Sequence, residues 1–167
     1  MRYLALGTAI VGLCAAVTAV AQAQATDPQV VAPLTKFIDA FNKGDMAGAA
    51  ATHASDADLA ITDEVAPFQW RGAQAFTSWA DDLTADAKKN GLTDQHVSIG
   101  KPTRVEVDGN SAYVVVPSVY SFKKGAVAMQ EKAQMTFVLR KGSSGWLIHG
   151  WTWTGPRAQK AATTAAK

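Results

Sequence analysis

The sequence predicts an α+β fold, with N-terminal helices packed on one face of a curved antiparallel sheet. The basis of this prediction is the order in which helix-like and strand-like patterns follow one another along the chain. Apolar residues recur at helical spacing in the first half, and long runs typical of strands fill the second half. Glycine-containing turns separate those runs, and no internal repeat interrupts them. We therefore expect one folded domain, residues 26–155, between an N-terminal leader and a C-terminal tail.

Residues 1–23 have the features of a secretory signal peptide, with cleavage after residue 23 or after residue 25. Arg2 gives a positive start, residues 4–20 carry no charge, and the motif Ala-Gln-Ala occurs twice directly afterwards. A membrane anchor is the weaker alternative, because the apolar run is short and no charged stop follows it. We expect an exported protein, periplasmic or secreted, without membrane association once the leader is removed.

Charge and cysteine content exclude several classes of protein. Cys14 is the only cysteine and lies in the leader, so the mature chain has no disulfide and no thiolate ligand or nucleophile. The 16 basic and 14 acidic residues nearly balance, and part of the basic excess lies in residues 156–167. That Ala/Thr/Lys-rich tail lacks periodicity and is predicted to be disordered. No basic stripe is left for a nucleic acid partner.

The first half of the domain contains the helices. Asp27-Pro28 suits a helix start, and Gly44 suits its end. Pro33 predicts a kink or a later start. Between these ends an apolar stripe follows helical spacing: Val30, Leu34, Phe37, Ile38 and Phe41.

Shorter elements follow the first helix. They are a short helix over residues 46–53, a strand over 58–62, a loop over 63–67 and a returning strand over 68–71. A second stripe then predicts a helix that Asn90-Gly91 closes: Phe76, Trp79, Ala80, Leu83 and Ala87.

Four long strands are predicted for the remainder, over residues 95–107, 111–122, 127–140 and 146–154. Pro102 is expected to break the first, and Pro117 requires an edge or a bulge in the second. The last run holds three of the five tryptophans and one of the three histidines. Strict alternation would put Leu147, His149, Trp151 and Trp153 on one face, as a pocket wall or as packed core.

The order of these pieces resembles the nuclear-transport-factor-like superfamily, and within it the SnoaL-like and ketosteroid-isomerase-like small proteins. The resemblance rests on Asn42-x-Gly44-Asp45, Trp70-x-Gly72 and Gly145-Trp146 in sequence, and it covers roughly residues 30–154. It implies a cone-shaped sheet wrapped around the helices, a pocket at the open end, and pairing of two copies through the outer face of the sheet. It does not by itself fix a function, because the superfamily mixes enzymes with non-catalytic proteins.

Asp63 and His149 are the candidate catalytic residues. Asp63 follows the short strand, about where ketosteroid isomerases place their base, but the tyrosine and protonated acid of those enzymes have no counterpart at Phe37 or around Thr136. The plain alternative is that Asp63 caps a turn. His149 could exchange a hydrogen bond with a ligand or act as a base, or it could be a satisfied structural residue.

Aromatic residues supply the candidate ligand wall: Trp70, Tyr120, Trp151 and Trp153. They could equally fill the core. The widely spaced histidines offer no metal site, and we expect no cofactor.

Three functions remain open. The first is an exported domain that binds a small apolar molecule or acts as an interaction module, with a homodimer expected and no catalysis. The second is a cofactor-free acid/base isomerase, dehydratase or cyclase that uses Asp63 and His149. The third is a structural dimer with a filled core.

Overall fold

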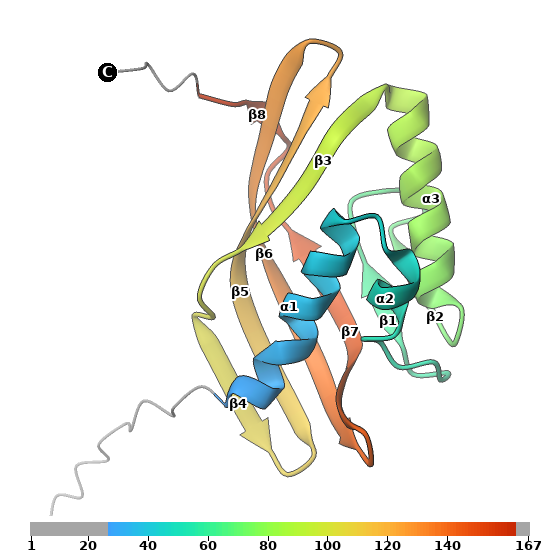
Figure 1. Cartoon of the computed structure of the whole chain (residues 1–167), viewed down its shortest axis with the longest axis vertical. Coiled ribbons are helices and arrows are strands. Elements are labelled where there is room, and N and C mark those ends of the chain that lie inside the picture. The colour runs from blue at the N-terminus through green and yellow to red at the C-terminus, as the bar shows by residue number, and fades with distance from the viewer. Residues whose placement is uncertain (1–26, 163–167) are drawn as a thin grey trace, which may run out of the picture.

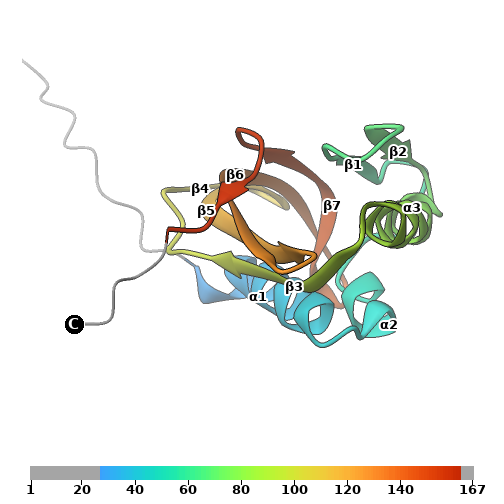
Figure 2. The same cartoon turned by 90° about the horizontal axis from the view of Figure 1, so that it is seen from above.

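The computed structural model describes residues 27–162, and the predicted leader lies outside this range. Helices α1 (Pro28–Asn42), α2 (Met46–Ala50) and α3 (Ala75–Asn90) lie on the concave side of one curved, unclosed sheet (Figures 1 and 2). The predicted α+β fold is confirmed. The strands are β1 (Ala60–Thr62), β2 (Gln69–Arg71), β3 (Leu92–Ile99), β4 (Arg104–Asp108), β5 (Ser111–Lys124), β6 (Val127–Gly142), β7 (Gly145–Thr154) and β8 (Gln159–Lys160).

The sheet is mixed and not purely antiparallel. Its main order is β2-β1-β7-β6-β5-β3, with β4 paired to β5 and β8 paired to β6. The pair β1–β7 is parallel, and these two strands come from opposite ends of the domain, so no hairpin joins them. All other pairs are antiparallel.

The first helix begins where the sequence predicts it. Asp27 caps it by accepting a hydrogen bond from the Gln29 amide at 2.9 Å, and Pro33 is accommodated inside the helix. The apolar stripe faces the sheet, so Val30, Leu34 and Phe37 are almost completely buried. They pack against inward residues of the sheet such as Val114, Phe137 and Ile148.

Asn42 connects the end of α1 to the sheet. Its Nδ2 donates to the Val97 carbonyl at 2.7 Å, and its Oδ1 accepts from the Val97 amide at 2.8 Å. The amide side chain therefore occupies the place of a further strand beside β3.

The strand predicted over 95–107 is two strands. The chain bends at residues 100–103, so that β3 pairs with the C-terminal half of β5 and β4 with its N-terminal half. Pro102 lies in this bend, where it needs no ladder hydrogen bond. Pro117 stays within β5, and its carbonyl accepts a hydrogen bond from the Gly100 amide at 2.8 Å.

The C-terminal segment differs from the expected disordered tail. Residues 155–162, which we call the strap, leave β7 and cross the end of the sheet. Gln159 and Lys160 pair with β6, and the Ala161 amide donates to the Ala128 carbonyl at 2.9 Å. Backbone hydrogen bonds to β6 order this segment, and its side-chain pattern gives no signal of that pairing.

Candidate functional site: a cavity at the wide end of the sheet

A cavity of about 360 Å³ opens between the C-terminal ends of α1 and α3 and the β5–β6 hairpin. That size is at the small end of the range for ligand pockets. Its walls are mainly aromatic and aliphatic, and they include Phe37, Phe41, Trp79, Leu83, Met135 and Trp151. The strap adds Arg157 and Ala158. Three carboxyl-bearing residues, Asp63, Glu64 and Glu131, form what we call the acidic end.

Asp63 enters the cavity from the loop after β1. Trp79 Nε1 on α3 donates to its Oδ2 at 2.7 Å, and the Glu64 amide donates to its Oδ1 at 2.7 Å. Burial raises the pKa of Asp63, and these two hydrogen bonds partly oppose that rise. The carboxyl group is thus fixed in orientation at the cavity wall. Its hydrogen bond from the Glu64 amide is also the contact expected if Asp63 caps a turn.

Glu131 is the second fixed carboxyl group. It lies on β6 with 1% of its surface exposed, and Trp153 Nε1 donates to its Oε1 at 2.6 Å. The strap crosses directly over it at Gly155, where a Cβ atom would lie 2.7 Å from Glu131 Oε1. A glycine is therefore needed for the strap to bury this side chain.

Glu64 faces Glu131 from the rim. Partial burial, a hydrogen bond to Glu131, and the charges of Glu131 and Asp63 raise the pKa of Glu64 to about 8, although the residue remains exposed to solvent. Arg157 on the strap opposes this shift. A pKa of about 8 favours the protonated form of Glu64 near neutral pH, so the cavity holds a protonated acid at its rim.

Tyr120 lies across the cavity on β5. Its hydroxyl donates to Gln95 Oε1 at 2.6 Å, so the donor is already engaged. Burial, followed by the charges of Glu64 and Asp63, raises the pKa of Tyr120. The hydroxyl stays protonated, and the ring packs at 6.4 Å from the Trp153 ring centroid as part of the wall.

Trp151 reaches the cavity with His53 behind it. Its Nε1 donates to His53 Nε2 at 3.1 Å, and His53 Nδ1 lies 3.0 Å from the Ala49 carbonyl. An indole N–H can only donate, so Nε2 must accept and the proton must sit on Nδ1. His53 is therefore held neutral, and burial lowers its pKa to about 4.

His149 does not line the cavity, and its predicted place beside Trp151 is wrong. The β6–β7 register shifts between Val138 and Leu139, so His149 forms a bulge. The bulge breaks the alternation: Ile148 and Trp151 both face inward, while His149 faces the outer side.

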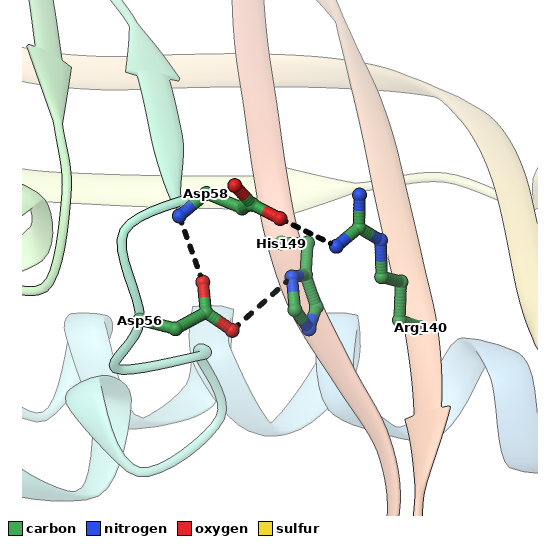
Figure 3. A network of polar contacts seen from close by, with 4 residues as sticks. All are labelled: Asp56, Asp58, Arg140 and His149. Atoms are coloured by element: carbon green, nitrogen blue, oxygen red, sulfur yellow. Dashed lines mark hydrogen bonds and ion pairs between the residues drawn. The ribbon is translucent and has the colours of Figure 1, made fainter.

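On the outer side, His149 Nδ1 lies 3.8 Å from Asp56 Oδ2, and Arg140 pairs with Asp58 at 2.9 Å (Figure 3). Asp56 also accepts a hydrogen bond from the Asp58 amide at 2.9 Å. These contacts tie the loop before β1 to β6 and β7, on a different surface from Asp63.

The six predicted site residues thus divide into two groups. Asp63, Tyr120, Trp151 and Trp153 line one cavity, whereas His149 and Trp70 do not. Trp70 is buried beside α3, where its Nε1 donates to Asp82 Oδ2 at 2.8 Å. Three residues at or behind the cavity were missed by the sequence reasoning: Glu64, Glu131 and His53.

Signals for these residues exist in the sequence. Glu131 is in phase with Met129, Met135 and Phe137 on an alternating strand, which predicts an inward carboxyl group. The bulge near His149 also has a signal, because a glycine inside a strand, here Gly150, indicates a bulge or a close backbone approach. The structure shows such an approach: a Cβ atom at Gly150 would lie 2.8 Å from the Ala60 carbonyl oxygen of β1.

Within residues 27–162 no cluster of His, Cys, Asp and Glu has the arrangement of a metal site. No helix in that range is long and apolar enough to span a membrane.

Comparison with known proteins gives a family and a set of similar folds. The family model described as "SnoaL-like domain" matches residues 30–151. No curated protein matches the sequence significantly.

Three solved structures illustrate the fold. A nuclear transport factor 2 (NTF2-like) superfamily protein from Salmonella enterica serovar Typhimurium has a TM-score of 0.64 and 12% identity, covering 84% of this chain and 96% of its own. A ketosteroid isomerase-like protein from Erwinia carotovora atroseptica has a TM-score of 0.60 and 17% identity, covering 78% and 95%. A scytalone dehydratase candidate from Novosphingobium aromaticivorans has a TM-score of 0.63 and 11% identity, covering 83% and 89%. At such identities the likeness shows the fold alone.

Proposed function

The chain belongs to the SnoaL-like domain family, and from that premise we propose that it binds a small, mainly apolar molecule in the cavity between α1, α3 and the β5–β6 hairpin. The observation that carries the proposal is the cavity itself, about 360 Å³ of space walled by aromatic and aliphatic side chains. Burial of apolar surface supplies the affinity, and the acidic end orients the ligand. The open cavity favours this function over the alternative of a filled core.

Filling the cavity tests the proposal. Ala87 on α3 lines it and is 6% exposed, whereas Ala85 on the same helix is exposed to solvent. Ala87→Phe places a ring in the ligand space, and Ala85→Phe adds the same ring outside it. The probe is N-phenyl-1-naphthylamine, an uncharged apolar dye that fluoresces when it leaves water.

Saturable binding of the dye to the native protein and to Ala85→Phe is expected, with loss of at least about tenfold in affinity for Ala87→Phe because the displaced apolar contacts are worth more than about 1.4 kcal/mol. Circular dichroism checks that both variants are folded. Equal dye binding by the two variants, or no saturable binding by the native protein, contradicts the proposal.

A second candidate function is acid/base catalysis, now with Asp63 and without His149. It is favoured by Asp63, whose pKa is raised by burial and which faces the same cavity as Glu64, whose raised pKa favours the protonated acid. Such a pair of groups can remove a proton from carbon and stabilise the negative charge that develops. The proton donor would be Glu64 in the loop after β1, and not a residue at the positions that the isomerase resemblance implies.

Proton exchange on a bound ketone tests this function without knowledge of the substrate. The protein is incubated in D₂O with 4-phenyl-2-butanone, and deuterium uptake beside the carbonyl is followed by NMR. Catalysis predicts exchange above the buffer rate that Asp63→Asn abolishes and His149→Gln leaves unchanged. Exchange at the buffer rate with the native protein would leave the binding function alone.

A further inference from the structure

The acidic end of the cavity restricts the charge of the ligand, and this inference rests on the proposed binding function. Asp63 and Glu131 each have one oxygen held by an indole N–H, from Trp79 at 2.7 Å and from Trp153 at 2.6 Å. The second Asp63 oxygen also accepts from the Glu64 amide at 2.7 Å. A carboxylate offers about four acceptor positions, so both groups still retain acceptor capacity. Neither indole has a second N–H to give.

The neutral donors of Tyr120 and Trp151 are already used within the protein. The Tyr120 hydroxyl donates to Gln95, and the Trp151 N–H donates to His53. A ligand at the acidic end therefore meets carboxyl acceptors and no free neutral donor from these two residues, with Arg157 as the cation that competes for the same acceptors. A group that brings several N–H donors fits this surface, whereas a group that only accepts does not.

Net charge points the same way. The residues that line the cavity include four acidic side chains and two basic ones: Asp63, Glu64, Asp86, Glu131, Lys124 and Arg157. With Glu64 protonated, the other acidic side chains of the lining still outnumber the basic ones by three to two. An anionic ligand would add to this excess inside an apolar enclosure, which is costly.

The aromatic walls complete the argument. Trp79 and Trp153 hold the carboxyl groups with their N–H edges and at the same time line the cavity with their rings, and Trp151 lies 5.0 Å from Trp79 between ring centroids. Indole faces attract cations, and the attraction grows where water is excluded.

We propose that the cavity selects a small molecule with an apolar body and a protonated amine, with the ammonium group received by Asp63 and Glu131. The apolar body lies toward Phe41, Leu83 and Met135, which line the same cavity. Arg157 on the exposed strap is the protein's own competing cation at this end, and its charge already acts on Glu64.

Three probes with one apolar body separate the ligand's charge from its hydrophobicity: 4-phenylbutylamine, 4-phenylbutan-1-ol and 4-phenylbutanoate, each titrated by calorimetry at pH 7. The expected order of affinity is amine, alcohol, carboxylate. The amine should bind at least about tenfold more tightly than the alcohol, because hydrogen bonds to charged groups contribute more than neutral ones.

Variants assign the preference to the acidic end. Glu131→Gln keeps an acceptor for Trp153 and should bring amine and alcohol affinities within about threefold of each other, with alcohol binding little changed. Arg157→Gln should strengthen amine binding. Glu106→Gln removes the same charge at an exposed position of β4 and should change nothing. If Glu131→Gln does not fold, Asp63→Asn takes its place, with an acceptor kept for Trp79.

The outcomes separate the two proposals. Binding of the alcohol as tightly as the amine, or tightest binding of the carboxylate, overturns the inference and leaves the binding function standing. Absence of binding by all three probes overturns both. An amine preference that survives in Glu131→Gln and in Asp63→Asn also overturns the inference, because the preference then arises elsewhere.

Discussion

His53 should make the protein lose stability in mild acid. Its Nε2 must accept from Trp151 and its Nδ1 faces the Ala49 carbonyl, so a second proton would break the contact with Trp151. Burial lowers its pKa from 6.5 to about 4. The unfolded chain therefore binds more protons than the folded one between these values. The stability that neutral His53 contributes is present above pH 6.5 and is lost as the pH falls toward 4.

The size of the effect follows from the two pKa values. Between pH 7 and pH 5, linkage gives a loss of about 2 kcal/mol from this residue. Only 5% of the residue is exposed, so solvent screening reduces this little. Asp63 and Glu64 act in the opposite sense, because their raised pKa values favour the folded state as the pH falls. The pH dependence of the native protein's stability is therefore the sum of these opposing contributions.

A variant isolates the contribution of His53. His53→Gln keeps an acceptor for Trp151 but does not titrate, and His96→Gln removes an exposed histidine as a control. Urea unfolding, followed by tryptophan fluorescence, is measured at pH 7 and pH 5 for all three proteins. The native protein and His96→Gln should lose about 2 kcal/mol more than His53→Gln over this interval. Equal losses in all three would refute the assignment of a neutral, acceptor-bearing His53.

Further predictions concern two structural contacts and two properties of the whole protein. Asn42→Ala leaves the Val97 amide and carbonyl without their partner and should lower the free energy of unfolding by about 2 kcal/mol; a loss no larger than that of the exposed Asn90→Ala would contradict this. Gly155→Ala forces a Cβ against Glu131 and should cost roughly 1–3 kcal/mol in thermal unfolding, whereas Gly142→Ala, with no atom within 4 Å of the added Cβ, should not. Intact mass of natively expressed protein should begin after residue 23 or 25, and a retained leader would disprove export by this signal. Light scattering should give a dimer mass at high micromolar concentration, and a monomer mass would count against pairing of the outer sheet faces.

The element order and the family could be predicted from sequence because they depend on local periodicity. The stripe from Val30 to Phe41 and the alternation along the later strands each repeat often enough to outweigh single exceptions such as Pro33. The resemblance to the nuclear-transport-factor-like superfamily is confirmed by the family match and by the similar folds.

The candidate site was harder to predict from the sequence, because it depends on strand register and on contacts between distant segments. A bulge of one residue at His149 moves Trp151 to the other side of the strand, next to the place where β1 approaches Gly150 closely. Glu131 is buried by the strap, which follows it by more than twenty positions. The raised pKa of Glu64 depends on Glu131 lying beside it, and no spacing rule predicts that two such distant segments meet.

The strap can change the cavity wall with little effect on the stability of the fold. Its residues are mostly exposed, yet Arg157 and Ala158 form part of the cavity wall. Substitutions at exposed positions usually change stability by less than about 0.5 kcal/mol. Natural variation can therefore alter this wall while the rings of α1, α3 and β7 stay fixed. We expect chimeras that exchange only residues 156–162 between homologues to exchange ligand preference while keeping their melting temperatures, because this segment borders the cavity and contributes little to the buried core.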